Sequence, residues 1–243
     1  MTMTGNDRHV QLFDERSPNA AGLLREFHDK VLSPSFPREE YIPPTTIDPA
    51  DDLTIIACAD DGTVIGGALG EVYPESGALL LGYLAVRPGS RGMGVGSVLL
   101  AALKERWLGQ YPLAFLELDD PRHHDTHPAY GDPARRLSFY GMFGIRVLTI
   151  PYFQPRLRAD LARGYHMLLG VIPPDGATLP GTMPASKVTA FLREYFVACE
   201  GPSALDDPEV RWLLDAAGQQ EDIALVGTEE YNRAPDPGPP GGR

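Results

Sequence analysis

The sequence contains little cysteine, and this scarcity excludes two kinds of architecture. Only Cys58 and Cys199 occur in 243 residues, the first inside an apolar run and the second inside a helical pattern. Two cysteines supply neither a disulfide framework nor the ligand set of a small zinc module. We therefore expect both to be reduced core residues of a cytoplasmic protein.

Positive charge is scarce as well. Lysine and arginine total 21 against 33 aspartates and glutamates, so the formal net charge is −12. Contact with nucleic-acid phosphates needs a concentrated basic surface. The balance of charge therefore predicts no nucleic-acid partner, and an acidic surface mildly favours a cationic substrate.

Long apolar runs are also missing. The opening residues, MTMTGNDRHVQLF, lack the basic start and apolar stretch of a signal peptide, and no run approaches the length of a membrane helix. We expect a soluble protein without a membrane partner.

What the sequence does contain is a regular succession of strand and helix patterns. A strand at 9–13 precedes apolar residues at helical spacing from Leu23 to Leu32. Three apolar segments follow, separated by the turns DDG and PESG, and they predict antiparallel strands at 53–59, 63–73 and 78–86. The remaining patterns predict a helix at 97–108, a strand at 113–119, a short helix at 134–144, strands at 145–153 and 165–172, and helices at 186–199 and 208–216.

Proline marks two passages where regular structure is not expected. The prolines of 33–52 predict a loop, and because long ordered loops are often functional, this one is a candidate wall of a substrate site. The tail at 232–243 is rich in proline and glycine, and we expect it to be disordered.

The most informative stretch is YLAVRPGSRGMGVGSVLLAALKERW at 83–107, in which a strand pattern, a glycine-rich turn and a helix follow one another. Backbone N–H groups at the start of a helix bind anions, and glycine lets a phosphate approach them. The nucleoside triphosphate motif GxxxxGK[ST] does not fit, because Val95 stands where the lysine is needed.

A dinucleotide-binding fingerprint fits better but incompletely. Gly92 and Gly94 match GxGxxG, whereas Ser97 stands in place of the third glycine. The acids Glu117 and Asp119 follow at about the distance of a ribose-binding carboxylate. The hairpin strands upstream do not suit a first βαβ unit, so this interpretation ranks second.

The segment LAVRPGSRGMGVGSVLL resembles the acetyl-CoA-binding motif of the GNAT superfamily of N-acetyltransferases, Arg/Gln-x-x-Gly-x-Gly/Ala, at Arg91, Gly94 and Gly96. The resemblance implies that backbone N–H groups of the turn hold the CoA pyrophosphate and that the preceding strand pairs with the pantetheine arm. The cofactor-binding residues it implies are Leu84, Val86, Arg91, Gly92, Met93, Gly94, Val95, Gly96 and Ser97.

The order of the elements and the segment SFYGMFGIRVL also resemble this superfamily. The resemblance implies an α/β (α+β) fold: a mixed, mainly antiparallel twisted sheet flanked by helices, with a helical C-terminal extension. The expected organisation is an acyltransferase domain at 8–172, the extension at 173–231 and the tail at 232–243.

The resemblance also implies catalytic groups. Tyr140 matches the tyrosine that acts as acid toward the departing thiolate, and because its position fits the motif we favour this role over the alternative of a core or CoA-packing aromatic. Glu117 matches the base of ribosomal-protein alanine N-acetyltransferases, and the alternative is a surface carboxylate on an alternating strand. Asp119, Glu71 and Tyr73 are the fallback candidates for the base.

The passage DPRHHDTHPAYGDP departs from the superfamily pattern. His123, His124, His127 and Asp125 are of types that bind zinc, but a polar loop with solvated histidines is the simpler interpretation. We therefore predict no metal. A histidine acting as general base stays open.

These observations predict an N-acetyltransferase that moves an acetyl or other short acyl group from acetyl-CoA to an amine of a small molecule or peptide by direct attack. The acceptor is an amine antibiotic, a small amine metabolite, or a protein N-terminus or lysine. A non-catalytic acyl-CoA-binding domain is the alternative. The aromatic stripe of Phe191, Tyr195 and Phe196 is expected to be core packing, and a lid or a homodimer surface stays open.

Overall fold

The computed structural model describes residues 2–5, 8–37, 53–128 and 131–236. The chain forms two compact units. The first comprises Met1–Val72, Leu79–Pro112 and His127–Gly131, and the second comprises Tyr73–Ala78, Leu113–Thr126 and Asp132–Arg243. The span 8–172 is therefore divided between both units, and 173–231 lies in the second. The greater part of the predicted loop wall, 38–52, and the end of the predicted tail, 237–243, lie outside the described residues.

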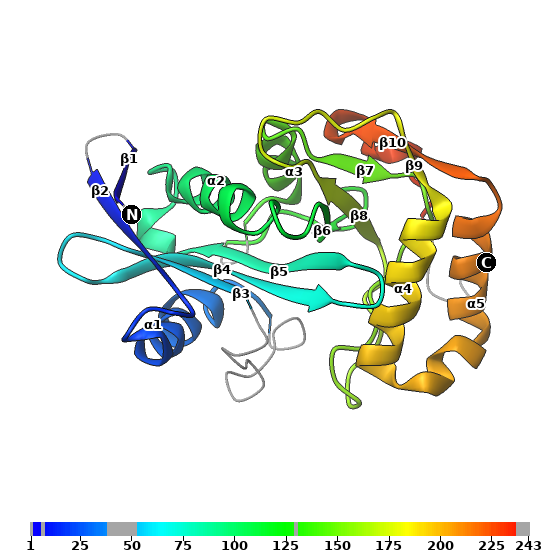
Figure 1. Ribbon diagram of the computed structural model, residues 1–243, viewed down its shortest axis with the longest axis horizontal. Coiled ribbons are helices and arrows are strands. Elements are labelled where there is room, and N and C mark those ends of the chain that lie inside the picture. The colour runs from blue at the N-terminus through cyan, green and yellow to red at the C-terminus, as the bar shows by residue number, and fades with distance from the viewer. Residues whose placement is uncertain (1, 6–7, 38–52, 129–130, 237–243) are drawn as a thin grey trace. The chain divides into compact units, whose positions relative to one another are not determined.

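The first unit contains an antiparallel succession of strands that follows chain order (Figure 1). Register pairs join β1 to β2, β2 to β3 and β3 to β4 in antiparallel fashion, and β5 is the next neighbour. The three strands predicted from the DDG and PESG turns are confirmed, whereas β1 was not predicted. The strands are β1 (Thr2–Gly5), β2 (Arg8–Asp14), β3 (Leu53–Cys58), β4 (Val64–Tyr73) and β5 (Ala78–Val86).

Helix α1 (Ala20–Phe27) covers one face of these strands and widens into a single π-helical turn at His28–Leu32. The apolar residues at the predicted helical spacing are all buried, which confirms that helix. The cluster that they form with the strands consists of Leu23, Leu24, Phe27, Val31, Leu32, Ile56, Cys58, Val64, Leu69, Tyr83 and Ala85.

Helix α2 (Val95–Arg106) covers the opposite face, and two adjacent glycines of β4 show how close both helices come. A Cβ added to Gly67 would lie 2.8 Å from the ring of Phe27 in α1, and one added to Gly66 would lie 3.0 Å from Cγ1 of Val95 in α2. Successive residues of a strand point to opposite faces. The glycine pair therefore lets one helix approach each face of β4.

The Gly67→Ala substitution tests this close contact. Because Phe27 is fully buried, its ring has no free space into which to move, and we expect the free energy of unfolding to fall by about 1–3 kcal/mol. Chemical denaturation followed by circular dichroism measures the change. Gly82→Ala in β5 is the matched control, because the nearest atom to its added Cβ lies 3.6 Å away. Equal loss of stability in both variants would contradict the argument.

The second unit has its own antiparallel strands, in the order β6-β8-β7-β10-β9. Strand β6 was predicted with its observed bounds, and β7 and β8 lie within the two strands predicted after it. The C-terminal extension was expected to be helical, but it also contributes β9 and β10 to the sheet. The strands are β6 (Leu113–Asp119), β7 (Arg146–Leu148), β8 (Met167–Ile172), β9 (Thr182–Pro184) and β10 (Asp222–Gly227).

Two helices of this unit begin at an Asp-Pro pair. The carboxylate of Asp132 accepts hydrogen bonds from the N–H groups of Ala134 and Arg135 at the start of α3 (Pro133–Gly141). Asp207 caps α5 (Pro208–Gly218) in the same way. A side-chain acceptor satisfies N–H groups that the first turn leaves open, and proline suits the first helical position because it has no N–H to satisfy.

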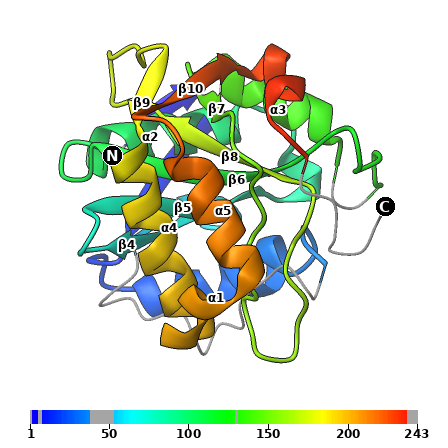
Figure 2. The ribbon, with the colours of Figure 1, turned by 90° about the vertical axis from the view of Figure 1, so that its right-hand side faces the viewer.

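Helix α4 (Ala185–Glu200) carries the predicted aromatic stripe, and it lies beside α5 (Figure 2). Phe191, Tyr195 and Phe196 are almost completely buried. The ring of Phe191 stacks on Phe115 of β6 with centroids 4.4 Å apart. The core-packing interpretation of the stripe is therefore confirmed.

A buried arginine joins the ends of both C-terminal helices. The guanidinium of Arg163 donates to Glu200 at 2.8 Å, to Asp207 at 2.9 Å and to Glu209 at 2.8 Å. These hydrogen bonds raise the pKa of Arg163. Burial by itself would raise the pKa of Glu200, but the hydrogen bonds from Arg163 outweigh it and hold that pKa below its usual value.

None of the helices in the described part of the chain is both long and apolar enough to cross a membrane.

Candidate functional site

The glycine-rich turn joins β5 to α2 through a short 3₁₀ turn at Pro88–Ser90. Gly92 has a φ of +78° and Gly94 a φ of +82°, both in the left-handed region. A Cβ added at either position would meet no atom within 4 Å. Glycine is therefore favoured here by the backbone conformation, and the space beside both residues is open.

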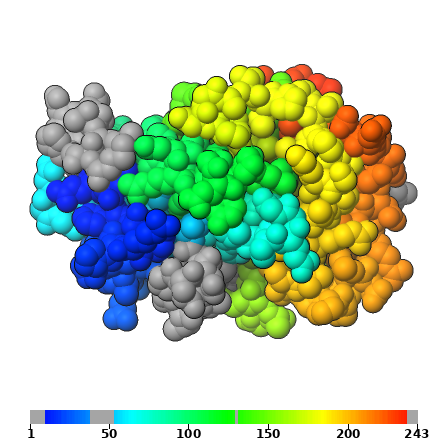
Figure 3. All heavy atoms as spheres, viewed as in Figure 1, coloured from blue at the N-terminus to red at the C-terminus, as the bar shows by residue number. Residues whose placement is uncertain are grey.

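The turn presents backbone N–H groups at the beginning of α2, which lies in green on the surface in Figure 3. Gly94 is the N-cap, and Val98 donates to its carbonyl at 3.1 Å. The N–H groups of Val95, Gly96 and Ser97 therefore have no partner inside the helix. Because the helix dipole is positive at this end, an anion is the natural ligand.

The side chain of Arg91 folds back and stabilises the glycine-rich turn through two hydrogen bonds. Its Nε donates to the carbonyl of Val86 at 3.2 Å, and its Nη2 to the hydroxyl of Ser35 at 3.3 Å. Leu84 and Val86 are both half-buried and alternate along β5 with fully buried neighbours. The predicted cofactor residues thus form one continuous segment from β5 to the first turn of α2.

Tyr140 lies in the second unit, on α3, and is 8% exposed. Burial raises its pKa to about 12, and the nearby Arg136 offsets this only in part. The phenol therefore keeps its proton throughout the neutral range.

Glu117, on β6 of the second unit, is held by three donors. Gln154 donates to Oε2 at 2.6 Å, Tyr195 lies 3.2 Å from the same oxygen, and Tyr152 makes a short hydrogen bond to Oε1. Burial raises the pKa of Tyr152 and of Tyr195 well above the usual value, and the charge of Glu117 adds to the effect. Hydrogen bonds to a carboxylate favour its ionised form.

The fallback candidates for the base have different surroundings. Asp119 forms a short ion pair with Arg136. Tyr73 is buried against aromatic rings of α4, with centroids 5.4 and 5.5 Å away. Glu71 lies on β4 in the first unit.

Only one member of the predicted loop cluster joins a group of potential metal ligands in the described residues. His123 lies with His166 and Asp236, both distant in the sequence. His124 Nε2 is 3.2 Å from the carbonyl of His166, and His127 exchanges backbone hydrogen bonds with Gly131 in the first unit.

Four residues of the groups around Glu117 and around His123 were not predicted from the sequence: Tyr152, Gln154, His166 and Asp236. Tyr152 and Gln154 are two residues apart in the sequence, and side chains at that spacing lie on the same face of a strand. That spacing does not reveal an acidic partner 35 residues away, and nothing local joins His166 to Asp236.

The family comparison bears on the first part of the chain. Residues 21–131 match the model of the acetyltransferase (GNAT) family. These residues form a GNAT acetyltransferase domain. The GNAT match contains the glycine turn, α2 and Glu117, and it ends before Tyr140.

Solved structures with acetyltransferase descriptions resemble the chain at low identity. One is a Bacteroides thetaiotaomicron protein described as a GNAT-family acetyltransferase, 24% identical, covering 61% of this chain and 80% of its own, with a TM-score of 0.47. Another is the ribosomal-protein-S18-alanine N-acetyltransferase of Escherichia coli, with 13% identity, 71% and 96% coverage and a TM-score of 0.47. A third, from Bacillus anthracis, is described as a streptothricin acetyltransferase in complex with acetyl coenzyme A, with 17% identity, 58% and 72% coverage and a TM-score of 0.39. No curated protein sequence matches the chain.

The Glu117→Gln substitution tests the three-donor arrangement. The new amide places an NH₂ group against donors that now meet an oxygen, so we expect the free energy of unfolding to fall by about 1–3 kcal/mol. Denaturation at neutral pH measures the loss. Glu105→Gln on the exposed side of α2 removes the same charge and should leave stability nearly unchanged. Equal midpoints for Glu117→Gln and the parent protein would show that the donors contribute nothing.

Proposed function

We propose that this protein is an acetyl-CoA-dependent N-acyltransferase that transfers an acetyl or other short acyl group to an amine. The observation that carries the proposal is the pair of glycines with left-handed backbone, Gly92 and Gly94. They leave the first N–H groups of α2 accessible, and they lie within the part of the chain that matches the GNAT family. The open space beside both glycines fits a phosphate group that must come close to backbone.

Each part of this segment has a role in the proposal. The N–H groups of Val95, Gly96 and Ser97 bind the pyrophosphate, while Gly92, Met93 and Gly94 bring the backbone to it. Acetyl-CoA supplies an acyl group already activated as a thioester. The backbone of Leu84 and Val86 pairs with the pantetheine arm and so orients the thioester.

In the transfer, the amine nitrogen bonds to the acyl carbon, the carbon–sulfur bond breaks, and the nitrogen loses a proton. We assign to Tyr140 the stabilisation of the sulfur that leaves with CoA. An ordinary cysteine thiol has a pKa of about 8.5, well below the value of about 12 that burial gives Tyr140. The phenol is therefore suited to stabilise the thiolate by donating a hydrogen bond rather than by giving up its proton completely.

We assign to Glu117 the role of general base, which accepts the proton that leaves the amine. The hydrogen bonds from Tyr152, Gln154 and Tyr195 favour its carboxylate form, which is the form that can accept the proton. Because the same bonds are expected to contribute to the stability of the fold, the rate and the stability of Glu117→Gln have to be measured separately.

The acceptor in this proposal is an amine of a small molecule or peptide, and the net charge of −12 favours a cationic one. The free thiols of Cys58 and Cys199 suit a reducing compartment, so we place the protein in the cytoplasm. The first experiment is calorimetric titration with acetyl-CoA and with NAD, followed by a panel of amines scored by release of free CoA thiol. Binding without release by any amine would favour the non-catalytic acyl-CoA-binding domain, and binding of NAD alone would overturn the proposal.

The Gly94→Glu substitution tests the pyrophosphate site. A carboxylate beside the first turn of α2 repels the pyrophosphate, and we expect acetyl-CoA affinity to fall by about a hundredfold or more in calorimetry. Gly62→Glu is the matched control, because Gly62 has the same φ of +82° and the same open surroundings in the turn between β3 and β4. Unchanged affinity in Gly94→Glu, or equal loss in the control, would refute the assignment.

The Tyr140→Phe substitution tests the assignment to the leaving sulfur. The loss of the hydroxyl should lower kcat by about 10²–10⁴-fold, with acetyl-CoA affinity nearly unchanged. The protonated form is the active one and is lost only as the pH rises through about 12, so the parent kcat should show no decline due to this group between neutral pH and 10.0, the usual tyrosine value. Equal kcat for variant and parent would remove the role.

A further inference from the structure

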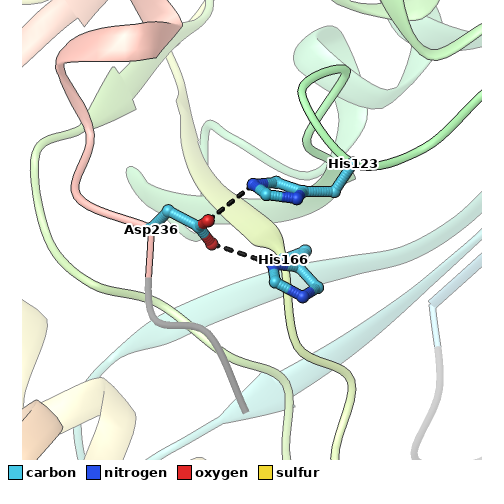
Figure 4. A group of neighbouring side chains, drawn as sticks. All are labelled: His123, His166 and Asp236. Carbon is cyan, nitrogen blue, oxygen red and sulfur yellow. Dashed lines mark hydrogen bonds and ion pairs between the residues drawn. The ribbon is translucent and has the colours of Figure 1, made fainter. Parts of the chain in front are cut away.

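Three side chains of the second unit meet away from the residues assigned above (Figure 4). His123 follows β6, His166 directly precedes β8, and Asp236 follows the 3₁₀ segment Thr228–Arg233. Nε2 of His123 lies 2.5 Å from Oδ2 of Asp236, and Nδ1 of His166 lies 2.9 Å from its Oδ1. The two imidazole rings stack with centroids 4.1 Å apart. One carboxylate thus serves two histidines.

The backbone of His166 is held in an unusual conformation. Its φ is +60°, and His166 is the one non-glycine residue with a positive φ in the described ranges. Its carbonyl accepts from the N–H of Asp120 at 3.0 Å and lies 3.2 Å from Nε2 of His124. Left-handed backbone at a non-glycine residue costs free energy and recurs at ligand-binding sites. Here the surrounding contacts hold it in place.

A buried ion pair positions the other two side chains. The carboxylate of Asp120 is 1% exposed and accepts from Nε of Arg122 at 2.8 Å. Nη2 of Arg122 also donates to the carbonyl of Ala234 at 3.0 Å. The pair therefore fixes both the loop that carries His123 and the chain segment that carries Asp236, in the manner of the outer hydrogen bonds that orient metal ligands.

We propose that His123, His166 and Asp236 form a binding site for a divalent transition-metal ion of the zinc class. Two imidazole nitrogens and one carboxylate oxygen are ligands of the kind that zinc prefers, and three protein ligands leave a fourth position for water. Magnesium prefers oxygen ligands and is not expected to bind. This site is independent of the proposed acyl transfer.

The geometry needs only a small adjustment to accept the ion. Ligand atoms around a tetrahedral zinc ion at about 2.05 Å lie roughly 3.3 Å from one another. The ligand atoms of the three residues already lie within 4.8 Å of one another. Rotation of the partly exposed side chains suffices to open the two short contacts to Asp236, and the ion then takes the place of the shared protons.

A metal ion here would join three segments that are distant in the sequence. It would fasten the chain after Thr228–Arg233 to the start of β8 and to the loop after β6, all within the second unit. Its primary effect would be on the stability of that unit.

The test uses the untagged full chain, treated with EDTA and dialysed. Calorimetric titration with Zn²⁺ should show one saturable site per chain, and titration with Mg²⁺ should show none. His166→Ala and Asp236→Asn should each weaken Zn²⁺ binding at least about tenfold. His127→Ala, from the same loop but outside the three residues, should leave the affinity unchanged.

Two further measurements keep the test decisive. A hundredfold excess of Zn²⁺ over its Kd should raise the Tm of the parent protein by about 5 °C and should not raise that of Asp236→Asn. His123→Ala, a change in an exposed loop, replaces His166→Ala if circular dichroism shows that the latter does not fold. No saturable Zn²⁺ binding by the parent, or equal affinity in parent and ligand variants, would overturn the proposal.

Discussion

The close approach of two helices to β4 is the constraint on which the first unit depends. Gly67 admits the ring of Phe27 on one face, and Gly66 admits Val95 and its helix on the other. A side chain at either position would push a helix away from the strand. The anion site proposed for the turn therefore depends on the packing beneath it as well as on its own glycines, because N–H groups at a helix start act only where the helix is fixed.

The second unit depends on buried or half-buried charges that are individually matched. Glu117 has three neutral donors, Arg163 has three carboxylates, and Asp120 has the guanidinium of Arg122. A buried charge without a partner is strongly unfavourable, so each of these groups requires its partners to be in place. Glu117 and Arg163 bond to residues far away in the chain, and Arg122, which pairs with Asp120 two residues before it, also donates to the distant carbonyl of Ala234. They give the C-terminal extension defined attachments to β6 and β8 in addition to the apolar contacts of α4.

The residues of the proposed reaction also come from two parts of the chain, one inside the GNAT match and one after it. The GNAT match at 21–131 contains the backbone that would hold acetyl-CoA and the strand that carries Glu117. Two of the three side chains that hold Glu117, Tyr152 and Gln154, follow that match, and the third, Tyr195, comes from α4 in the extension. The extension therefore contributes directly to the surroundings of the proposed base. The hydrogen bonds to Glu117 thus come from residues outside the matched region.

The sequence by itself determined the local features: the hairpin strands, the turn of Gly92 and Gly94, the helix starts at Asp-Pro pairs and the buried face of α4. Each of these follows from spacing, turn chemistry or backbone freedom within a few residues. The sequence did not predict β9 and β10, because β10 forms where β7 offers it a partner and β9 pairs in turn with β10. The tertiary structure alone decided which polar groups meet, since Glu117 with Tyr195 and His123 with Asp236 are contacts between segments that no local pattern connects.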